Sequence, residues 1–171
     1  MTNDIVILDG ARTPVGTFGG SLAGISPVDL ATHVTTQALK RTGVDSAQIG
    51  HVVFGNVITT EPRDMYLGRV AAVIAGIPDS PPAMNVNRLC GSGAQPIVSA
   101  AQSLILGRPA CAIAAGADDV HRALGRAHRV AFGAHHGGGG GVFLHGFAAG
   151  TQGHQQAADL AWRGLAFEQY A

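Results

Sequence analysis

The sequence predicts an α/β fold with a mostly parallel sheet and covering helices. Signals for strands and helices alternate along the first two thirds of the chain, which is typical of right-handed crossovers between parallel strands. The 171 residues are 46% hydrophobic and 13% charged, a composition that supports a buried core. We expect the order βαβαβαβ in one incomplete domain over residues 1–123, followed by an irregular Gly/His-rich tail over 124–171.

The first strand and helix have clear local signals. The apolar run IVIL at 5–8 favours a strand that is buried on both faces. The helix that follows should begin at an N-cap serine, with a proline in its first position and a glycine at its end: Ser26, Pro27 and Gly43. Its apolar stripe is expected at Leu30, Ala31, Val34, Ala38 and Leu39.

The remaining elements repeat this alternation. Further strands are expected at 51–58, 83–87 and 110–115, and further helices at 64–75 and 97–106. In parallel sheets, ligands gather beyond the carboxyl ends of the strands. Arg12 and Asn56 follow the first two strands there, and each could contact a ligand or be a solvated or capping loop residue.

The segment NRLCGSG at 87–93 places Cys90 at that edge of the sheet. The pKa of a thiol falls at a helix N-terminus, where backbone N–H groups favour the thiolate and could stabilise an oxyanion. Gly91 and Gly93 would let a substrate approach closely. A buried cysteine beside a tight turn fits the same spacing, but strand, cysteine, glycine turn and helix in this order favour a nucleophile.

The start of the helix after Cys90 has two possible positions. Ser92 and Gln95 have the spacing of a capping box, which would begin the helix near Gly93. Pro96 would then stand at the fourth position and remove a backbone hydrogen bond. A later start, nearer Pro96, would leave Cys90 with a weaker helix dipole.

Charge and hydropathy exclude several classes of partner. Eleven basic and eleven acidic residues balance to a formal charge of zero, so we expect no nucleic-acid partner. No apolar run approaches the roughly 18 residues that span a bilayer, so we expect no membrane partner and a cytoplasmic location. Cys111 sits in the apolar stretch PACAIAAG and is expected to be an inert core thiol.

The tail at 124–171 differs in composition. Gly137–Gly141 is typical of a flexible linker, and a short helix is expected after residue 155. Several histidines raise the hypothesis of a metal site: His135, His136, His145 and His154. Their spacing matches no familiar ligand pattern, so a solvated segment and no metal is the favoured interpretation.

Several long motifs resemble the amino-terminal half of the thiolase family, the bacterial acetyl-CoA acetyltransferases and β-ketothiolases. They are ARTPVGTFGGSLAGISPVDLA, HVVFGNVITTEPRDMYLGRVAAV, NVNRLCGSGAQPIVSAAQSLILG and AAGAD, within residues 4–123. The resemblance implies a thiolase-like half, with a sheet that is mixed in the full family, and a homo-oligomer. It also implies that Cys90 takes an acyl group from an acyl-CoA as a thioester. Coenzyme A would carry the substrate, with no tightly bound cofactor, in fatty acid or polyhydroxyalkanoate metabolism.

The chain departs from the family in the rest of the catalytic machinery. The resemblance implies two catalytic histidines, in Asn-Glu-Ala-Phe and Gly-His-Pro settings, and a second cysteine in a glycine-rich loop. Neither setting occurs in this sequence, and residues 124–171 stand where a CoA-binding insert would begin. We therefore expect a truncated form with impaired turnover. The alternative is a non-catalytic half-thiolase that serves as an interaction or CoA-thioester-binding module.

Overall fold

The computed structural model describes residues 5–14, 20–107, 109–118 and 146–151. Its strands are β1 (Ile5–Ala11), β2 (Ile49–Gly55), β3 (Ala83–Val86), β4 (Cys111–Gly116) and β5 (Gly146–Thr151). Its helices are α1 (Pro27–Thr42), α2 (Leu67–Ile74) and α3 (Gln95–Ile105), with short 3-10 helices η1 (Ser46–Gln48) and η2 (Pro62–Tyr66). The predicted order βαβαβαβ is confirmed from β1 to β4.

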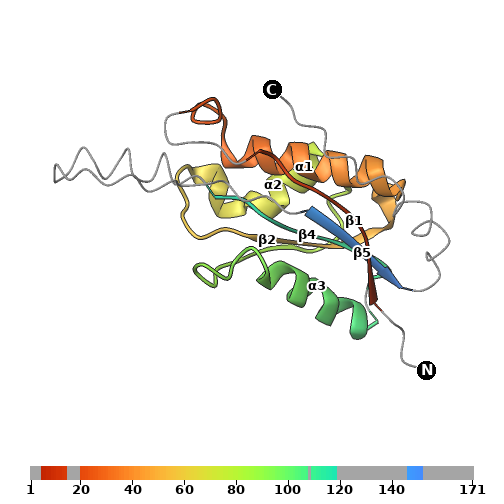
Figure 1. Ribbon diagram of the computed structural model, residues 1–171. Helices are drawn as coiled ribbons and strands as arrows, with labels where there is room; N and C mark the ends of the chain where they lie inside the picture. Colours follow the sequence, from red (N-terminus) through yellow and green to blue (C-terminus); the bar gives the residue numbers. More distant parts are fainter. Residues whose placement is uncertain (1–4, 15–19, 108, 119–145, 152–171) are drawn as a thin grey trace.

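The sheet has the order β1-β5-β4-β2-β3. β2 pairs in parallel with β3 on one side and with β4 on the other, whereas β5 lies antiparallel between β4 and β1. Helices α1 and α2 cover one face of this sheet and α3 covers the other (Figure 1). The carboxyl ends of β2, β3 and β4 therefore meet at one edge, as the sequence predicts.

The strand β5 corrects our expectation that the tail is irregular before residue 155. Its backbone pairs with both neighbours, with Val6 opposite Gly150 and Ile113 opposite Ala148. The sequence GFAAGT contains no alternation of apolar and polar residues and none of the usual strand formers except its phenylalanine and threonine. Without β5, the facing edges of β1 and β4 would leave backbone N–H and C=O groups unpaired, and pairing with these groups explains the position of β5. No pattern within the β5 sequence indicates this pairing.

The prediction that β1 is buried on both faces is wrong. Ile7 is 49% exposed, although Leu8 beside it is 6% exposed. β1 forms the outer edge of the sheet, and an apolar run alone does not distinguish an edge strand from a central one.

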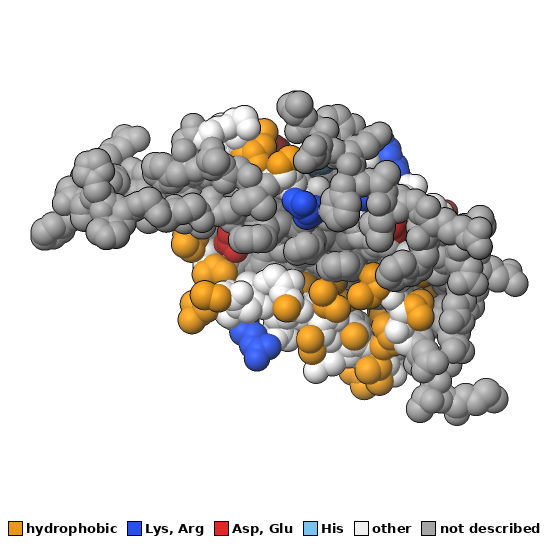
Figure 2. All heavy atoms as spheres, in the orientation of Figure 1, with side chains coloured by type: hydrophobic (Ala, Val, Ile, Leu, Met, Phe, Trp, Pro, Cys, Tyr) orange, Lys and Arg blue, Asp and Glu red, His pale blue; other side chains and the backbone are white. Residues whose placement is uncertain are grey.

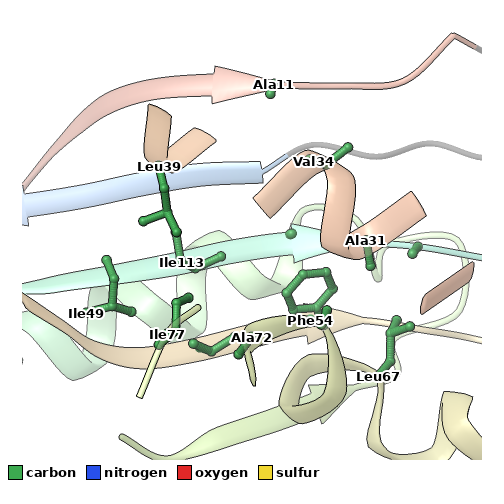
Figure 3. Packing of buried hydrophobic residues seen from close by; sticks show 14 of the residues in the cluster. Ala11, Ala31, Val34, Leu39, Ile49, Phe54, Leu67, Ala72, Ile77 and Ile113 are labelled. Carbon is green, nitrogen blue, oxygen red and sulfur yellow. The ribbon is translucent and has the colours of Figure 1, made fainter. Parts of the chain in front are cut away.

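The helix α1 confirms its predicted caps. The Ser26 Oγ accepts a hydrogen bond from the Asp29 N–H at 3.1 Å, and Gly43 has a φ of 64° with its N–H donated to the Leu39 carbonyl. The whole predicted apolar stripe is buried. Ala31 lies toward Phe54 of β2 and Leu39 lies toward Ile113 of β4, and Val34 belongs to the same buried cluster (Figure 3). Burial of each large side chain in this cluster contributes about 1.5–3 kcal/mol.

The opposite face of the sheet carries a smaller core under α3. Its buried members are Val53, Ala100, Leu104, Ala112 and Ala114. The outer side of α3 stays open to solvent, and Val98, Ile105 and Leu106 are 47%, 71% and 74% exposed. Hydrophobic side chains gather on the lower side of Figure 2, where α3 lies in Figure 1. None of the helices described is long and apolar enough to cross a membrane.

Candidate functional site

Cys90 lies in the turn between β3 and α3, at the carboxyl edge of the parallel strands. Its side chain is exposed, whereas Cys111 is buried in β4 with 1% of its surface exposed. The alternative of a buried structural cysteine is therefore wrong for Cys90. The prediction of a core thiol is confirmed for Cys111, and burial raises the pKa of that thiol, with the backbone hydrogen bond at Ala112 acting the other way.

A tight turn presents the Cys90 side chain. Leu89 has a φ of 47°, in the left-handed region that leucine rarely adopts. The N–H of Gly91 donates to the Arg88 carbonyl at 3.0 Å and the N–H of Ser92 donates to the Leu89 carbonyl at 2.9 Å. These bonds close the backbone around Cys90 and leave its side chain outside the turn.

The helix α3 begins at Gln95, so the capping-box prediction for Ser92 is wrong and the later start is confirmed. The Ser92 Oγ accepts the Arg88 N–H at 2.8 Å, and the Gln95 N–H donates instead to the Gly91 carbonyl at 3.1 Å. Pro96 stands in the first turn of the helix, where a missing N–H has no partner to lose. The turn thus separates Cys90 from the first residue of the helix.

Two glycines form the surface beneath this turn. A Cβ on Gly55, the last residue of β2, would overlap the carbonyl oxygen of Ser92. A Cβ on Gly116, the last residue of β4, would lie 3.4 Å from the Gly93 Cα. Our sequence reasoning missed both residues, although a glycine at the end of each neighbouring strand is the signal that could have identified them.

Asn56 is a structural residue rather than an exposed ligand contact. It is 5% exposed, and its Nδ2 donates to the Ala117 carbonyl at 2.9 Å and to the Asp118 Oδ1 at 3.2 Å. It therefore ties the end of β2 to the end of β4. Arg12 is exposed, and its Nη1 donates to the neighbouring Thr13 carbonyl at 3.2 Å.

Asp118 fixes the loop that follows β2. Its Oδ1 accepts the N–H groups of Val57 at 2.8 Å and Ile58 at 3.0 Å. Burial raises the pKa of the Asp118 carboxyl, these two N–H groups lower it, and the charge of Asp64 raises it further. Sequence reasoning missed this residue because its partners are 61 and 60 positions away.

Asp64 is a fully buried carboxylate whose charge acts on Asp118. Its Oδ2 accepts the N–H and the hydroxyl of Thr60, both at 2.8 Å, and the N–H of Glu61 at 2.9 Å. The Asp64 Oδ1 makes no hydrogen bond. These bonds order the segment that enters η2, so the carboxylate has a structural role in the loop before that helix.

The described histidines lie away from Cys90. His33 is exposed on α1, and the His51 Nδ1 at the start of β2 lies 2.9 Å from the Ser103 Oγ near the end of α3. Across the described ranges, no three His, Cys, Asp or Glu side chains are grouped to hold a metal ion. The four histidines of the metal hypothesis, the glycine tract and the helix expected after residue 155 lie outside the described residues.

Comparisons with known proteins agree on one family. The chain matches the family model "Thiolase, N-terminal domain" over residues 5–141. It is 56% identical over 123 residues to the β-ketothiolase BktB of Cupriavidus necator, a match that covers 72% of this chain and 31% of the relative. It is 39% identical over 120 residues to an acetyl-CoA acetyltransferase of the same organism, covering 70% of this chain and 30% of the relative.

Solved structures give the same result. The human mitochondrial 3-ketoacyl-CoA thiolase matches with a TM-score of 0.69 and 30% identity, over 71% of this chain and 31% of that one. The acetyl-CoA acetyltransferase of Bacillus anthracis matches with a TM-score of 0.64 and 37% identity, over 68% and 29%. The chain thus spans about a third of the length of these relatives. The family that the motifs predict is confirmed, and this chain belongs to the thiolase family.

Proposed function

We propose that this chain performs the acylation step of a thiolase-type acyltransferase, with Cys90 as the nucleophile. The observation that carries the proposal is the exposure of Cys90 in a closed turn between β3 and α3, at the carboxyl edge of the parallel strands. The Cys90 thiolate attacks the thioester carbonyl of an acyl-CoA. A bond forms between Sγ and the carbonyl carbon, the bond from that carbon to the CoA sulfur breaks, and the CoA thiolate takes up a proton.

Coenzyme A is the proposed carrier of the substrate. The names of the relatives support this choice, since they include an acetyl-CoA acetyltransferase and a 3-ketoacyl-CoA thiolase, and the latter has also been solved in complex with CoA. Acyl transfer between two thiols changes no oxidation state, so the step needs no tightly bound redox cofactor. We further propose that the protein acts in the cytoplasm, on acyl-CoA substrates of fatty acid or polyhydroxyalkanoate metabolism.

The second step is the formation or thiolysis of a 3-ketoacyl-CoA, and we propose that this chain alone performs it poorly. That step requires a base to take a proton from acetyl-CoA or from the CoA thiol. Two histidines lie in the described segments. His33 is on α1, and His51 is near the amino end of β2, opposite to the edge where Cys90 lies. No described histidine is placed to supply this base, and we propose that acylated Cys90 accumulates, with impaired turnover by this chain alone.

A non-catalytic half-thiolase module is the second candidate. The exposed apolar side of α3, formed by Val98, Ile105 and Leu106, favours it because such a face is suited to contact with another chain. Such a module would bind a partner or a CoA thioester without forming a covalent adduct.

Intact mass spectrometry after incubation with acetyl-CoA separates the two candidates. We expect one acetyl group per chain, with release of an equal amount of CoA. The adduct should be absent from Cys90→Ala and unchanged in Cys111→Ala, which is the matched control because that thiol is buried. No adduct on the wild-type chain would reject the acylation step and favour the module, whereas an adduct that survives Cys90→Ala would reject Cys90 as the nucleophile.

A further inference from the structure

The residue before Cys90 holds an unfavourable backbone conformation. Within the described segments, Leu89 is the only residue other than glycine with a positive φ, at 47°. A leucine in this region costs free energy because its Cβ approaches the backbone, so the conformation persists only where neighbouring contacts fix it. This conformation sets the direction in which the chain leaves β3 and therefore where the Cys90 side chain is presented.

Asn87 makes the side-chain contacts that can fix this conformation. Its Oδ1 accepts the N–H of Leu89 at 2.9 Å, and its Nδ2 donates to the carbonyl of Val57 at 3.1 Å. The first bond acts on the left-handed residue itself. The second bond ties the same side chain to the loop after β2.

The loop that receives Asn87 is itself held from the next strand. The Val57 N–H donates to the Asp118 Oδ1 at 2.8 Å, while the carbonyl of the same residue accepts from Asn87 at 3.1 Å. A continuous series of hydrogen bonds thus runs from the end of β4, through the loop after β2, to the residue that precedes Cys90. On its other side, the turn is closed by the bond from the Arg88 N–H to the Ser92 Oγ.

We propose that Asn87 is a positioning residue, which holds Leu89 in its left-handed conformation and so places the Cys90 thiol for attack on the acyl group. The proposal rests on the proposed acylation of Cys90 for its kinetic readout. It assigns Asn87 no contact with substrate. Its action is through the backbone of Leu89.

A set of three variants tests this role in the full chain. Asn87→Ala removes both hydrogen bonds and should slow acetyl transfer from acetyl-CoA to Cys90 by about tenfold or more, because small errors in the position of a nucleophile are costly. Asn85→Ala is the matched control, since this asparagine lies on β3 and bonds instead to Gly68, Asp64 and Met65. We expect it to acetylate within about twofold of the wild-type rate, although both variants lose side-chain hydrogen bonds of similar number.

Rescue by glycine distinguishes positioning from general support of the fold. Glycine adopts a φ of 47° without the penalty that leucine has. Asn87→Ala combined with Leu89→Gly should therefore recover acetyl transfer toward the wild-type rate. Wild-type rates in Asn87→Ala alone, or a double variant as slow as Asn87→Ala, would overturn the proposal.

The rate of alkylation by iodoacetamide at a fixed pH keeps the test independent of the proposed function. If the wild-type chain forms no acetyl adduct, the acylation proposal fails, but the placement of the thiol can still be read from this rate. Asn87→Ala should change the alkylation rate, because the Cys90 side chain leaves the position that Leu89 sets, and the double variant should restore it. A wild-type alkylation rate in Asn87→Ala would reject the positioning role.

Discussion

Gly55 lies directly beneath the carbonyl oxygen of Ser92, so closely that a Cβ at position 55 would overlap this oxygen. The contact joins the last residue of β2 to the turn that presents Cys90. A backbone oxygen cannot swing away as the end of a long side chain can. The distance between the sheet and the Cys90 turn therefore depends on the absence of a side chain at position 55.

Gly55→Ala should displace the turn and destabilise the fold. We expect a loss of about 1–3 kcal/mol in the free energy of unfolding, typical of overpacking, together with slower acetylation of Cys90. Gly24→Ala is a suitable control, because a Cβ there meets no atom within 4 Å, and its effect should stay within about 0.5 kcal/mol. Urea unfolding of both variants measures the difference, and equal losses would contradict the close contact.

The two cysteines should differ sharply in their reactivity in the folded chain. Cys90 is exposed, whereas Cys111 is buried in β4 and burial raises the pKa of its thiol, so it has little access and little thiolate. Iodoacetamide near neutral pH should label one thiol per folded chain, and peptide mapping should assign it to Cys90. Cys111 should react only after unfolding in urea. Labelling of both cysteines at similar rates in the folded chain would show that this account of Cys111 is wrong.

How far the sequence predicts the fold depends on how local each signal is. The helix α1 was predicted in detail because its caps, Ser26 and Gly43, act on backbone groups within the same helix. The strand β5 was not predicted, since its partners β1 and β4 are distant in the sequence and its own residues have no strand pattern. Pairing between segments that are distant in the sequence produces no recognisable pattern within either segment.

The candidate site divides in the same way. The order of strand, cysteine, glycine turn and helix pointed to Cys90 from the sequence. Asp118 and Gly55, which support the turn, were missed because they act on backbone groups of other segments. An aspartate that accepts two N–H groups 61 and 60 positions away resembles any other loop aspartate in the sequence.

Pro96→Ala should modestly increase the reactivity of Cys90. Pro96 stands in the first turn of α3, and alanine adds a backbone N–H at the end of the helix that favours negative charge. We expect faster alkylation of Cys90 by iodoacetamide. Because Pro96 is buried, the free energy of unfolding should be measured in parallel. Unchanged alkylation across the pH range would count against any influence of α3 on the thiol.

The free edge of the sheet at β3 is the expected site of self-association. In the described segments β3 is the terminal strand, and Met84 on it is 38% exposed, near the more exposed Met65 and Tyr66 of η2. A lysine on an edge strand opposes pairing between strands, so Met84→Lys should shift an oligomer toward the monomer. Val73→Lys, at a 50% exposed position on α2, is the control with the same change of charge. Sedimentation velocity measures the distribution of monomers and oligomers. The wild-type distribution in both variants would contradict this prediction.

Asp118 should make the stability of the folded chain depend on pH in the weakly acidic range. Burial raises the pKa of its carboxyl, so in that range the folded chain keeps a proton that the unfolded chain has lost. The free energy of unfolding therefore falls as pH rises from about 3.9, the usual pKa of aspartate, to the raised value, and this contribution is constant above it.

Asp118→Asn tests this dependence while it preserves the acceptor. The asparagine Oδ1 can still accept the N–H groups of Val57 and Ile58, but it does not titrate. Relative to the wild-type chain, the variant should gain stability as pH rises through this interval and hold the gain at higher pH. Asp79→Asn, at an exposed position, removes the same charge and is the matched control. Urea unfolding at a series of pH values measures the free energy of unfolding of Asp118→Asn relative to the wild-type chain. If this difference stays constant or falls as pH rises, burial does not raise the pKa of the Asp118 carboxyl.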